Sequence, residues 1–424
     1  MSERSVHLTA LRGGAELGGV ALRVDCGETS ILLDCGIGGE EDRSWLRKLD
    51  GLDGVWVSHA HLDHCGALGG LFEGRPTLKG WCAPDTRSLL EHSLSHLDDV
   101  DSERAADLAD AFREIPFRRY VDLSPRTADD VRVMAFRAGH VLGAGMLLVE
   151  FGTEDPFRIV YTGDFCCHDQ PVVPGAHLPR PGEDFEVDLL VMEGVLATDE
   201  EADAVDVDRE WGRVREFAGT ENPTLVAANP LGEAVEAAAA LADSPTECVV
   251  ASSMEPVFDC YVRSTNVEID ASILRFAESE GLEAALERGA TVIAPGDQLE
   301  QGTPSRRLAA RLVGDVGAHI AVFNRAYAST LAGRLVDVER GESIRMFGGD
   351  DRPTTLRAEV ERFVLPNHAP RWQLVETVRA LQPEEVVLVH GRRSRLHALR
   401  RAVKAEKMGA AIRVPENGET LRLD

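Results

Sequence analysis

The segment SHAHLDHCGAL at residues 58–68 places His59, His61, Asp63 and His64 within six positions, directly after the apolar run GVWV. In an extended loop, side chains two positions apart point to the same side, so His59 and His61 can bind one ion. Asp63 and His64 then turn toward a second position as the next helix begins. Imidazole and carboxylate groups together suit zinc first, and iron or manganese after it. The segment therefore predicts a metal centre at the end of a strand, and a chance cluster of surface histidines is the weaker interpretation.

Three other polar residues stand at the ends of apolar strands. His140 follows VRVMAFR, Asp164 ends FRIVYTGD, and His390 follows EVVLV. A single histidine in such a place is more often structural, but three residues in one context beside the cluster favour a role as ligands. Seven ligands suit two ions. We predict that one ion binds His59, His61 and His140, that the other binds Asp63, His64 and His390, and that Asp164 bridges them.

The length and the order of the elements predict a domain with an insertion. At 424 residues, the chain exceeds the roughly 250–300 residues that one hydrophobic core supports. Short apolar strands separated by Gly and Asp fill most of the first 165 residues, and the helices occur together in groups between them. This order favours a sheet sandwich flanked by helices. After about residue 200, helices and strands alternate in an α/β pattern. We predict an α/β protein with a sandwich over 1–200, an insertion over 201–340 and the rest of the sandwich over 341–424.

The charge is strongly acidic, with a formal net charge of −27 and only four lysines beside 41 arginines. This balance is typical of a protein that works in concentrated salt, where the Debye length falls to about 3 Å near 1 M. A moderately acidic protein with a codon bias is the alternative. In the halophilic interpretation, the acidic net charge reflects the salt in which the protein works, so it does not exclude a nucleic-acid partner.

The chain offers no apolar run of about 18 residues and no leader pattern, and none of its eight cysteines forms a C-x-x-C pair. We therefore expect a soluble, reduced, cytoplasmic protein without a membrane partner.

The order of the ligands and the insertion resemble the β-CASP nucleases of the metallo-β-lactamase superfamily, which include the cleavage and polyadenylation endonuclease and ribonuclease J. The resemblance covers nearly the whole chain. It implies a metallo-β-lactamase αββα sandwich split by an inserted α/β β-CASP domain, with the last metal histidine on a strand after the insertion, as in VVLVHG here. GGAELGGVALRV and ILLDCGI look like the opening hairpins of the family, which makes Asp34 a support for the metal ligands.

The same resemblance implies the catalytic residues. Glu193 in LLVMEG matches an acidic residue of the family, and His368 in VLPNHAPRWQLVE matches a histidine at the end of the insertion. His368 would protonate the leaving 3′ oxygen with Glu193 as its carboxylate partner, and Asp63 belongs to the catalytic set as well. The implied reaction is hydrolysis of RNA phosphodiester bonds by a hydroxide that two zinc ions activate. The flanks depart from the family pattern, because Gly194 follows Glu193 and Asn367 precedes His368.

Arginine can contact phosphates in a bidentate manner, so exposed arginines are candidates for nucleic-acid binding. We name Arg334, which matches a family position, together with Arg306, Arg307, Arg392, Arg393 and Arg395. Trp372 and Tyr327 are the candidate stacking aromatics, and core packing is the favoured interpretation for both.

The favoured function is a zinc-dependent ribonuclease of archaeal type that acts on single-stranded RNA in 3′-end processing or decay, alone, as a homodimer or with a paralogous β-CASP partner. A DNA-processing nuclease would use the same metals, and a catalytically silent subunit of an RNA-processing complex would explain the altered flanks. A small-molecule thioester hydrolase is disfavoured, because such an enzyme needs no inserted domain to hold a polymer.

Overall fold

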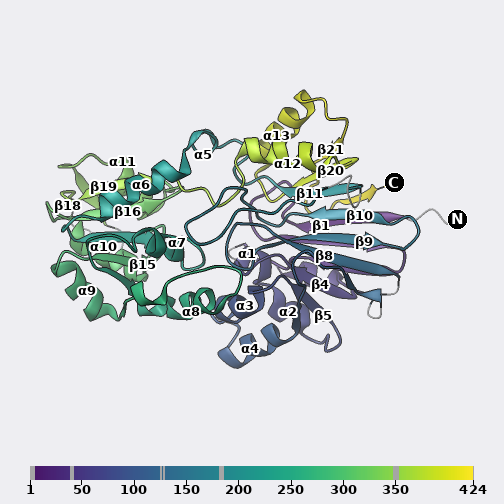
Figure 1. The fold of residues 1–424 in the computed structure, drawn as a ribbon, viewed down its shortest axis with the longest axis horizontal. Coiled ribbons are helices and arrows are strands. Elements are labelled where there is room, and N and C mark those ends of the chain that lie inside the picture. The colour runs from purple at the N-terminus through teal and green to yellow at the C-terminus, as the bar shows by residue number, and fades with distance from the viewer. Residues whose placement is uncertain are drawn as a thin grey trace. The chain divides into compact units, whose positions relative to one another are not determined.

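Within the described residues, two seven-stranded sheets form the core of one structural unit (Figure 1). The computed structural model describes residues 5–38, 43–124, 127, 129–180, 186–346 and 353–423. The chain divides into two units. The first unit comprises Met1–Asp169, Pro174–Asp203 and Asn367–Asp424, and the second comprises Gln170–Val173 and Ala204–Pro366.

The first sheet combines strands from both ends of the chain in the order β22-β1-β2-β3-β4-β5-β6. Its strands are β1 (Val6–Arg12), β2 (Ala21–Cys26), β3 (Thr29–Leu33), β4 (Gly54–Val57), β5 (Lys79–Cys82), β6 (Phe112–Glu114) and β22 (Thr420–Leu423). Strands β1, β2 and β3 pair as antiparallel neighbours, whereas β3 to β6 run parallel. Parallel neighbours end at the same edge of the sheet, which matters for the site below.

The second sheet has the order β21-β20-β11-β10-β9-β8-β7. Its strands are β7 (Val121–Asp122), β8 (Val131–Arg137), β9 (Gly145–Phe151), β10 (Phe157–Tyr161), β11 (Leu189–Glu193), β20 (Glu385–Val389) and β21 (Ala411–Arg413). Strands β10, β11, β20 and β21 run parallel, so segments before and after the second unit lie side by side. Strand β20 is therefore fixed beside β11 although nearly 200 residues separate them in sequence.

The sheets pack through a shared apolar core, with Leu8 and Leu22 of the first sheet and Val133 and Val149 of the second in one buried cluster. Burial of one such side chain contributes about 1.5–3 kcal/mol. Helices cover the outer faces (Figure 1). They are η1 (Ser44–Lys48), α1 (Leu62–Cys65), α2 (Leu68–Phe72), α3 (Thr86–Leu94) and α4 (Ser102–Asp110) toward the first sheet, and α12 (Arg371–Leu381) and α13 (Arg393–Ala405) against the second. This arrangement confirms the predicted αββα sandwich.

The second unit is built on a parallel sheet in the order β14-β13-β15-β12-β16-β19. Its strands are β12 (Thr224–Ala228), β13 (Cys248–Ala251), β14 (Phe276–Ala277), β15 (Thr291–Pro295), β16 (His319–Phe323) and β19 (Glu359–Phe363), with a small pair of β17 (Ser343–Arg345) and β18 (Pro353–Thr355). The connecting helices are α6 (Val207–Ala218), α7 (Glu233–Ala240), η3 (Ser252–Met254), α8 (Glu255–Arg263), η4 (Ala271–Ile273), α9 (Ser279–Glu287), α10 (Pro304–Leu312) and α11 (Leu331–Asp337), and α5 (Glu200–Ala204) precedes them. The predicted alternation of helices and strands is present.

The end of the insertion differs from the sequence boundary at 340. Strand β19 belongs to the sheet of the second unit, because it pairs in parallel with β16 from His319↔Glu359 to Phe323↔Phe363. The chain returns to the sandwich at Asn367. A short run of alternating apolar residues predicts a strand but does not say which sheet the strand joins, and here the edge of β16 accepts it.

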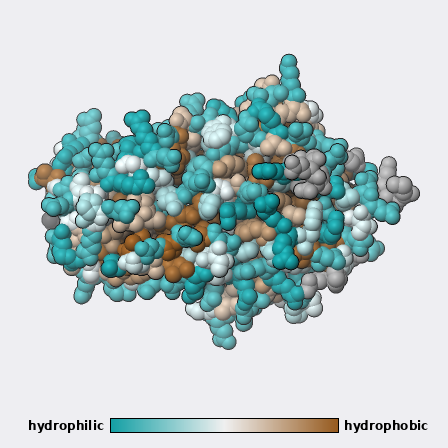
Figure 2. Space-filling model, viewed as in Figure 1, coloured by the Kyte–Doolittle hydropathy of each residue, from teal (hydrophilic) through white to brown (hydrophobic). Residues whose placement is uncertain are grey.

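None of the described helices is long and apolar enough to cross a membrane. All eight cysteines lie within the described residues and are free thiols. Hydrophilic side chains cover most of the face that Figure 2 shows, in keeping with the formal net charge of −27.

Candidate metal centre

The candidate ligands meet because they follow strands that end at one edge of the sandwich. In the first sheet, His59 lies just beyond the end of β4, and His61 stands at the start of α1. In the second sheet, Asp164 lies just beyond β10 and His390 directly follows β20, which runs parallel to the intervening β11. Parallel strands bring their carboxyl ends to the same edge, so residues far apart in sequence converge.

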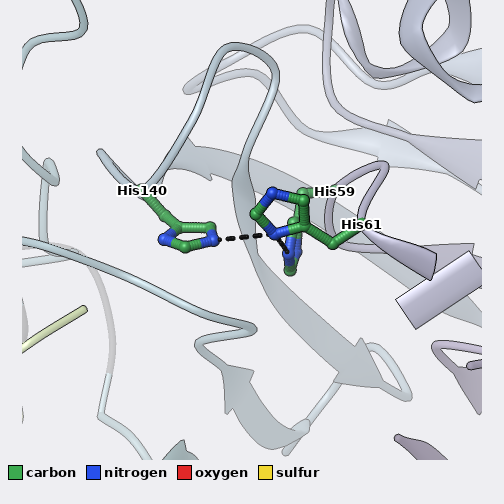
Figure 3. A group of neighbouring side chains, drawn as sticks. All are labelled: His59, His61 and His140. Carbon is green, nitrogen blue, oxygen red and sulfur yellow. Dashed lines mark hydrogen bonds between the residues drawn. The ribbon is translucent and has the colours of Figure 1, made fainter. Parts of the chain in front are cut away.

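His59, His61 and His140 form one group of ligand atoms (Figure 3). His61 Nδ1 lies 3.0 Å from His59 Nε2 and 3.1 Å from His140 Nε2. Nitrogen ligands of one tetrahedral zinc ion are about 3.3 Å apart, since each lies 2.0–2.1 Å from the metal. The spacing of the three nitrogens therefore fits a shared ion.

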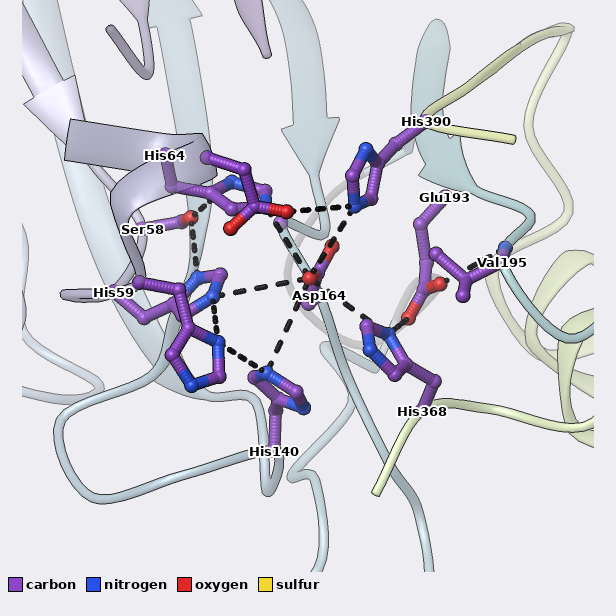
Figure 4. A network of polar contacts seen from close by, with 12 residues as sticks. Ser58, His59, His64, His140, Asp164, Glu193, Val195, His368 and His390 are labelled. Carbon is purple, nitrogen blue, oxygen red and sulfur yellow. Dashed lines mark hydrogen bonds and ion pairs between the residues drawn. The ribbon is translucent and has the colours of Figure 1, made fainter. Parts of the chain in front are cut away.

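Asp63, His64 and His390 form a second group. Figure 4 shows His64 and His390 next to Asp164. His390 Nε2 lies 3.7 Å from Asp63 Oδ2 and 3.6 Å from Asp164 Oδ2. Asp164 Oδ2 also lies 3.2 Å from His64 Nε2 and 3.8 Å from His59 Nε2. Asp164 thus stands between the two groups, where a bridging carboxylate would stand.

The backbone of His390 turns its ring into the cluster. Its φ of 47° lies in the left-handed region, which costs a residue with a side chain about 1–3 kcal/mol. The N–H of His390 donates a hydrogen bond to the carbonyl oxygen of Gly13 at 2.7 Å, which holds this conformation.

The chemistry of the donor set fits a metal. His59, His64, His140 and Asp164 are buried, with at most 2% of the surface of each exposed. Asp164 Oδ1 is a buried side-chain atom that has no hydrogen-bond partner among the described residues. Polar atoms left unsatisfied in this way are costly, and a bound cation would satisfy them. The cluster is therefore able to hold metal.

The electrostatics favour neutral histidines on one side of the cluster and a charged carboxylate beside them. Burial, together with neighbouring histidines, lowers the pKa of His59 and His140 well below the usual range. Burial opposes ionisation of Asp164, but His64 and His390 outweigh it and hold its pKa well below the usual value. A neutral imidazole and an ionised carboxylate are the states in which both residues bind metal.

Asp34 supports the cluster through hydrogen bonds. It accepts hydrogen bonds from His64 Nδ1 at 2.7 Å, Tyr161 Oη at 2.5 Å, the N–H of Ser58 at 2.6 Å and the Ser58 hydroxyl at 2.8 Å. The bond from His64 Nδ1 fixes the tautomer and leaves Nε2 as the ligand atom. Asp34 is predictable from the sequence, whereas Ser58 and Tyr161 carry no signal beyond their places beside strand ends.

His368 lies next to the cluster and pairs with Glu193 (Figure 4). Its Nδ1 lies 3.2 Å from Glu193 Oε1 and 3.7 Å from Asp164 Oδ2. Burial lowers the pKa of His368, but Glu193 and then Asp164 raise it more, to about 9. Glu193 is itself held by the N–H groups of Phe165 at 3.0 Å and Val195 at 3.2 Å. The arrangement provides a protonated imidazole at neutral pH beside the candidate ligands.

Comparison with known proteins places this architecture in a family. Residues 16–186 match the model of the metallo-beta-lactamase superfamily, and residues 354–415 match that of the Zn-dependent metallo-hydrolase RNA specificity domain. The chain also aligns with the "Cleavage and polyadenylation specificity factor 73" of Drosophila melanogaster, with 25% identity over 437 residues. The chain belongs to the β-CASP family.

Other β-CASP relatives align along much or part of the chain. "RNase aCSPSF2" of Saccharolobus solfataricus is 25% identical over 100% of this chain and 86% of its own length. "Transcription termination factor FttA" of Methanothermobacter thermautotrophicus is 30% identical over 46% of this chain and 32% of its own length. The Drosophila protein is matched over 95% of this chain but only 62% of its own length, so the chain spans less than two thirds of that relative.

A solved structure supports the fold of this β-CASP chain. The crystal structure of a protein of unknown function from Enterococcus faecalis V583 matches with a TM-score of 0.58 and 15% identity, covering 99% of this chain and 100% of the other. At this identity the likeness concerns the fold alone.

The arginines named from sequence occupy different environments in this β-CASP protein. Arg307 donates to Ser279 Oγ at 2.7 Å and faces Glu283, Arg393 pairs with Glu416, and Arg395 donates to the carbonyl oxygen of Val195. Arg392 is exposed before α13. Burial and then the positive charge of Arg334 lower the pKa of Arg306. The nucleic-acid contacts remain predictions.

The favoured interpretation of the two aromatics was wrong. Trp372 is 53% exposed and Tyr327 is 42% exposed, so neither packs in the core. Trp372 lies on the outward side of the first turn of α12, next to the buried Gln373 and Leu374. A lone aromatic at a helix start does not reveal which side of the helix it will occupy.

Proposed function

We propose that this β-CASP protein is a zinc-dependent ribonuclease that hydrolyses phosphodiester bonds of single-stranded RNA in 3′-end processing or decay. One observation carries the proposal. The His368–Glu193 pair lies against Asp164, the carboxylate that stands between two groups of candidate metal ligands. An imidazole that can give a proton is thus placed beside groups that can hold cations.

The residues of the two groups would hold two zinc ions, with His59, His61 and His140 on one and Asp63, His64 and His390 on the other. Asp164 would contact both. Bound there, the ions would lower the pKa of a water molecule to about 7 and offset the negative charge of the phosphate. Asp34 would keep His64 in the correct tautomer through the 2.7 Å hydrogen bond.

His368 would donate a proton to the 3′ oxygen as it leaves. Its raised pKa keeps it protonated at neutral pH, and Glu193 fixes its Nδ1, which leaves Nε2 for the substrate. General acid catalysis of this kind contributes typically about 10²–10⁴-fold. The products would be a 5′-phosphate and a 3′-hydroxyl.

RNA is proposed as the polymer because residues 354–415 match an RNA specificity domain and because relatives carry names of RNA-processing factors. Arg306 and Arg334 are the preferred phosphate contacts, since the positive charge of Arg334 acts on Arg306 and a phosphate would relieve that repulsion. DNA is the alternative polymer, because the same metals would act on it. We also propose a cytoplasmic location and a homodimer or a paralogous partner as the assembled form.

The test is cleavage of RNA labelled at the 5′ or the 3′ end, in molar salt, with and without a chelator. We expect chelator-sensitive cleavage that zinc restores, and the position of the label separates endonuclease from exonuclease products. A DNA strand of the same sequence tests the polymer. Metal-loaded protein that cleaves neither strand and captures an active paralogue would instead be a silent subunit.

A further inference from the structure

The first turn of α12 is bonded to the loop that follows Asp164. Gln373, which is 1% exposed, accepts a hydrogen bond through Oε1 from the N–H of Cys167 at 2.8 Å. Its Nε2 lies 3.1 Å from Nδ1 of His168. A buried amide that uses both ends of its side chain fixes two backbone segments relative to each other. Here it ties the helix after His368 to the chain after Asp164.

The same turn is bonded on another side by Asp203. Asp203 Oδ1 accepts a hydrogen bond from the N–H of Trp372 at 3.0 Å, and Oδ2 accepts one from Arg371 Nη2 at 2.5 Å. The side chain of Asp203 is only 16% exposed. Asp203 is the last residue of the sandwich before the second unit, and Arg371 follows soon after the chain returns at Asn367. Asp203 therefore joins the chain just before the insertion to the chain just after it, and it accepts a hydrogen bond from one N–H of the first turn of α12.

The loop that carries His368 leads directly into the first turn of α12. Residues 364–369 lie outside helices and strands, so contacts of the loop itself, such as the bond from His140 to Asn367, and contacts at its ends hold His368 in place. The ring of His368 must nevertheless stay 3.2 Å from Glu193 Oε1 and 3.7 Å from Asp164 Oδ2. A displacement of about 1 Å in a reacting group can lower a rate by about 10²-fold.

We propose that Gln373 and Asp203, called here the α12 clamp, are positioning residues that hold His368 where it can protonate the leaving group. Neither residue is placed near the substrate, and both act through the first turn of α12. The inference rests on the proposed function, since it assumes that His368 acts as the general acid.

The experiment compares two phosphodiesters with different leaving groups. The leaving 3′ oxygen of RNA requires a proton, whereas the leaving p-nitrophenolate of bis(p-nitrophenyl) phosphate is stable without one at neutral pH. A misplaced general acid therefore slows the first reaction and spares the second. Loss of metal or of folding slows both, so the pair of substrates separates a positioning role from a purely structural one.

The variants are Gln373→Leu, which keeps the volume but removes both hydrogen bonds, and Asp203→Asn, which keeps an acceptor for Trp372 but removes the charge facing Arg371. Glu376→Gln on the exposed side of α12 is the matched control, because it pairs with Arg379 on the same helix. We expect kcat on RNA to fall about 10–100-fold in each clamp variant. Turnover of the aryl ester, metal content and the control variant should stay within about twofold of the parent.

Equal losses on both substrates, or unchanged kcat on RNA, would overturn the inference while leaving the proposed function intact. If the parent protein cleaves the aryl ester but no RNA, the proposed function fails. The crystal structures of the two variants then test whether the α12 clamp positions His368. Crystal structures of the two variants should show His368 displaced from Glu193, whereas a ring still 3.2 Å from Oε1 in both overturns the proposal.

Discussion

The backbone carbonyl oxygen of Asn367 accepts a hydrogen bond from Nδ1 of His140 at 2.8 Å. A carbonyl can only accept, so the proton of His140 is on Nδ1 and the lone pair of Nε2 faces the metal cluster. The next residue along the chain is His368. One dipeptide therefore orients a candidate metal ligand through its backbone and carries the candidate general acid on its side chain.

Replacing His368 with Ala should lower turnover of RNA about 10²–10⁴-fold, because the leaving oxygen would receive no proton from the protein. Metal content should not change, since the contact with His140 comes from the backbone. Elemental analysis and single-turnover kinetics measure both quantities. Asn367→Ala is the matched control and should resemble the parent. Loss of metal from the His368 variant would show that this residue is a ligand and not the acid.

Replacing Asp34 with Ala should weaken metal binding by about 10–100-fold, the usual effect of losing a carboxylate that supports a histidine ligand. The cause is the loss of the acceptor for His64 Nδ1. Competition with a metallochromic chelator measures the affinity. Tyr161→Phe removes one donor to the same carboxylate and keeps the bond to His64, so its loss should be smaller. Equal affinity in the parent and the Asp34 variant would contradict this role.

The pH dependence of turnover should report Glu193. A general acid works while protonated, so activity that depends on His368 should fall as pH rises through its pKa of about 9. Glu193 raises that pKa, and Glu193→Gln should therefore move the decline to lower pH. Profiles of kcat from pH 6 to pH 10 test this. If kcat of the Glu193 variant declines at the same pH as kcat of the parent, the decline does not arise from the His368–Glu193 pair.

Stability should also depend on pH through Glu236 of α7, which accepts hydrogen bonds from the N–H groups of Val172 at 2.6 Å and Val173 at 3.1 Å. Burial raises the pKa of Glu236 from 4.5 to about 8, although both hydrogen bonds lower it. Between these values the folded protein binds a proton that the unfolded chain has lost. The contribution of Glu236 to the free energy of unfolding is therefore complete below about pH 4.5 and is lost by about pH 8. Between these values the free energy of unfolding falls by up to about 1.4 kcal/mol per pH unit.

Glu236→Gln should flatten this part of the stability curve, whereas the exposed Glu216→Gln should leave it unchanged. Denaturant unfolding at intervals from pH 5 to pH 9 measures the difference between parent and variant. If the free energies of unfolding of the parent and of the Glu236 variant change with pH in parallel, Glu236 does not cause the pH dependence.

Arg334 should contribute to RNA affinity more than Arg307. Arg307 faces the negative charge of Glu283, whereas burial and then the positive charge of Arg334 lower the pKa of Arg306, so Arg334 adds to a region of positive charge. Removing one phosphate contact reduces the slope of log affinity against log salt by about 0.7 for a single strand. We expect this change in Arg334→Ala and none in Arg307→Ala, measured by fluorescence anisotropy between 0.2 and 2 M salt with metal-free protein. The reverse ranking would remove Arg334 from the proposed binding surface.

Local patterns in the sequence were sufficient to predict many of the elements and to place the candidate ligands at the ends of strands. The strand before His59, the helix 371–381 and the strand 224–228 follow from the spacing of apolar residues, which is a property of neighbouring positions. His390 could be named as a candidate ligand because it shares its place at the end of an apolar strand with His140 and Asp164.

The fold class and the family were predicted from a resemblance, carried by the order of the candidate ligands and by the α/β insertion, and both are confirmed. The halophilic interpretation stays a prediction, because it concerns the solvent.

Tertiary structure alone decided which distant groups meet. Tyr161 reaches Asp34 across 127 positions of sequence, and Gln373 reaches Cys167 across 206. Strand β19 joins the sheet of the second unit instead of the sandwich, and Trp372 faces outward instead of inward. Propensity and periodicity act over a few residues, whereas partners of buried polar groups and the sheet that a strand joins are set by how remote segments pack.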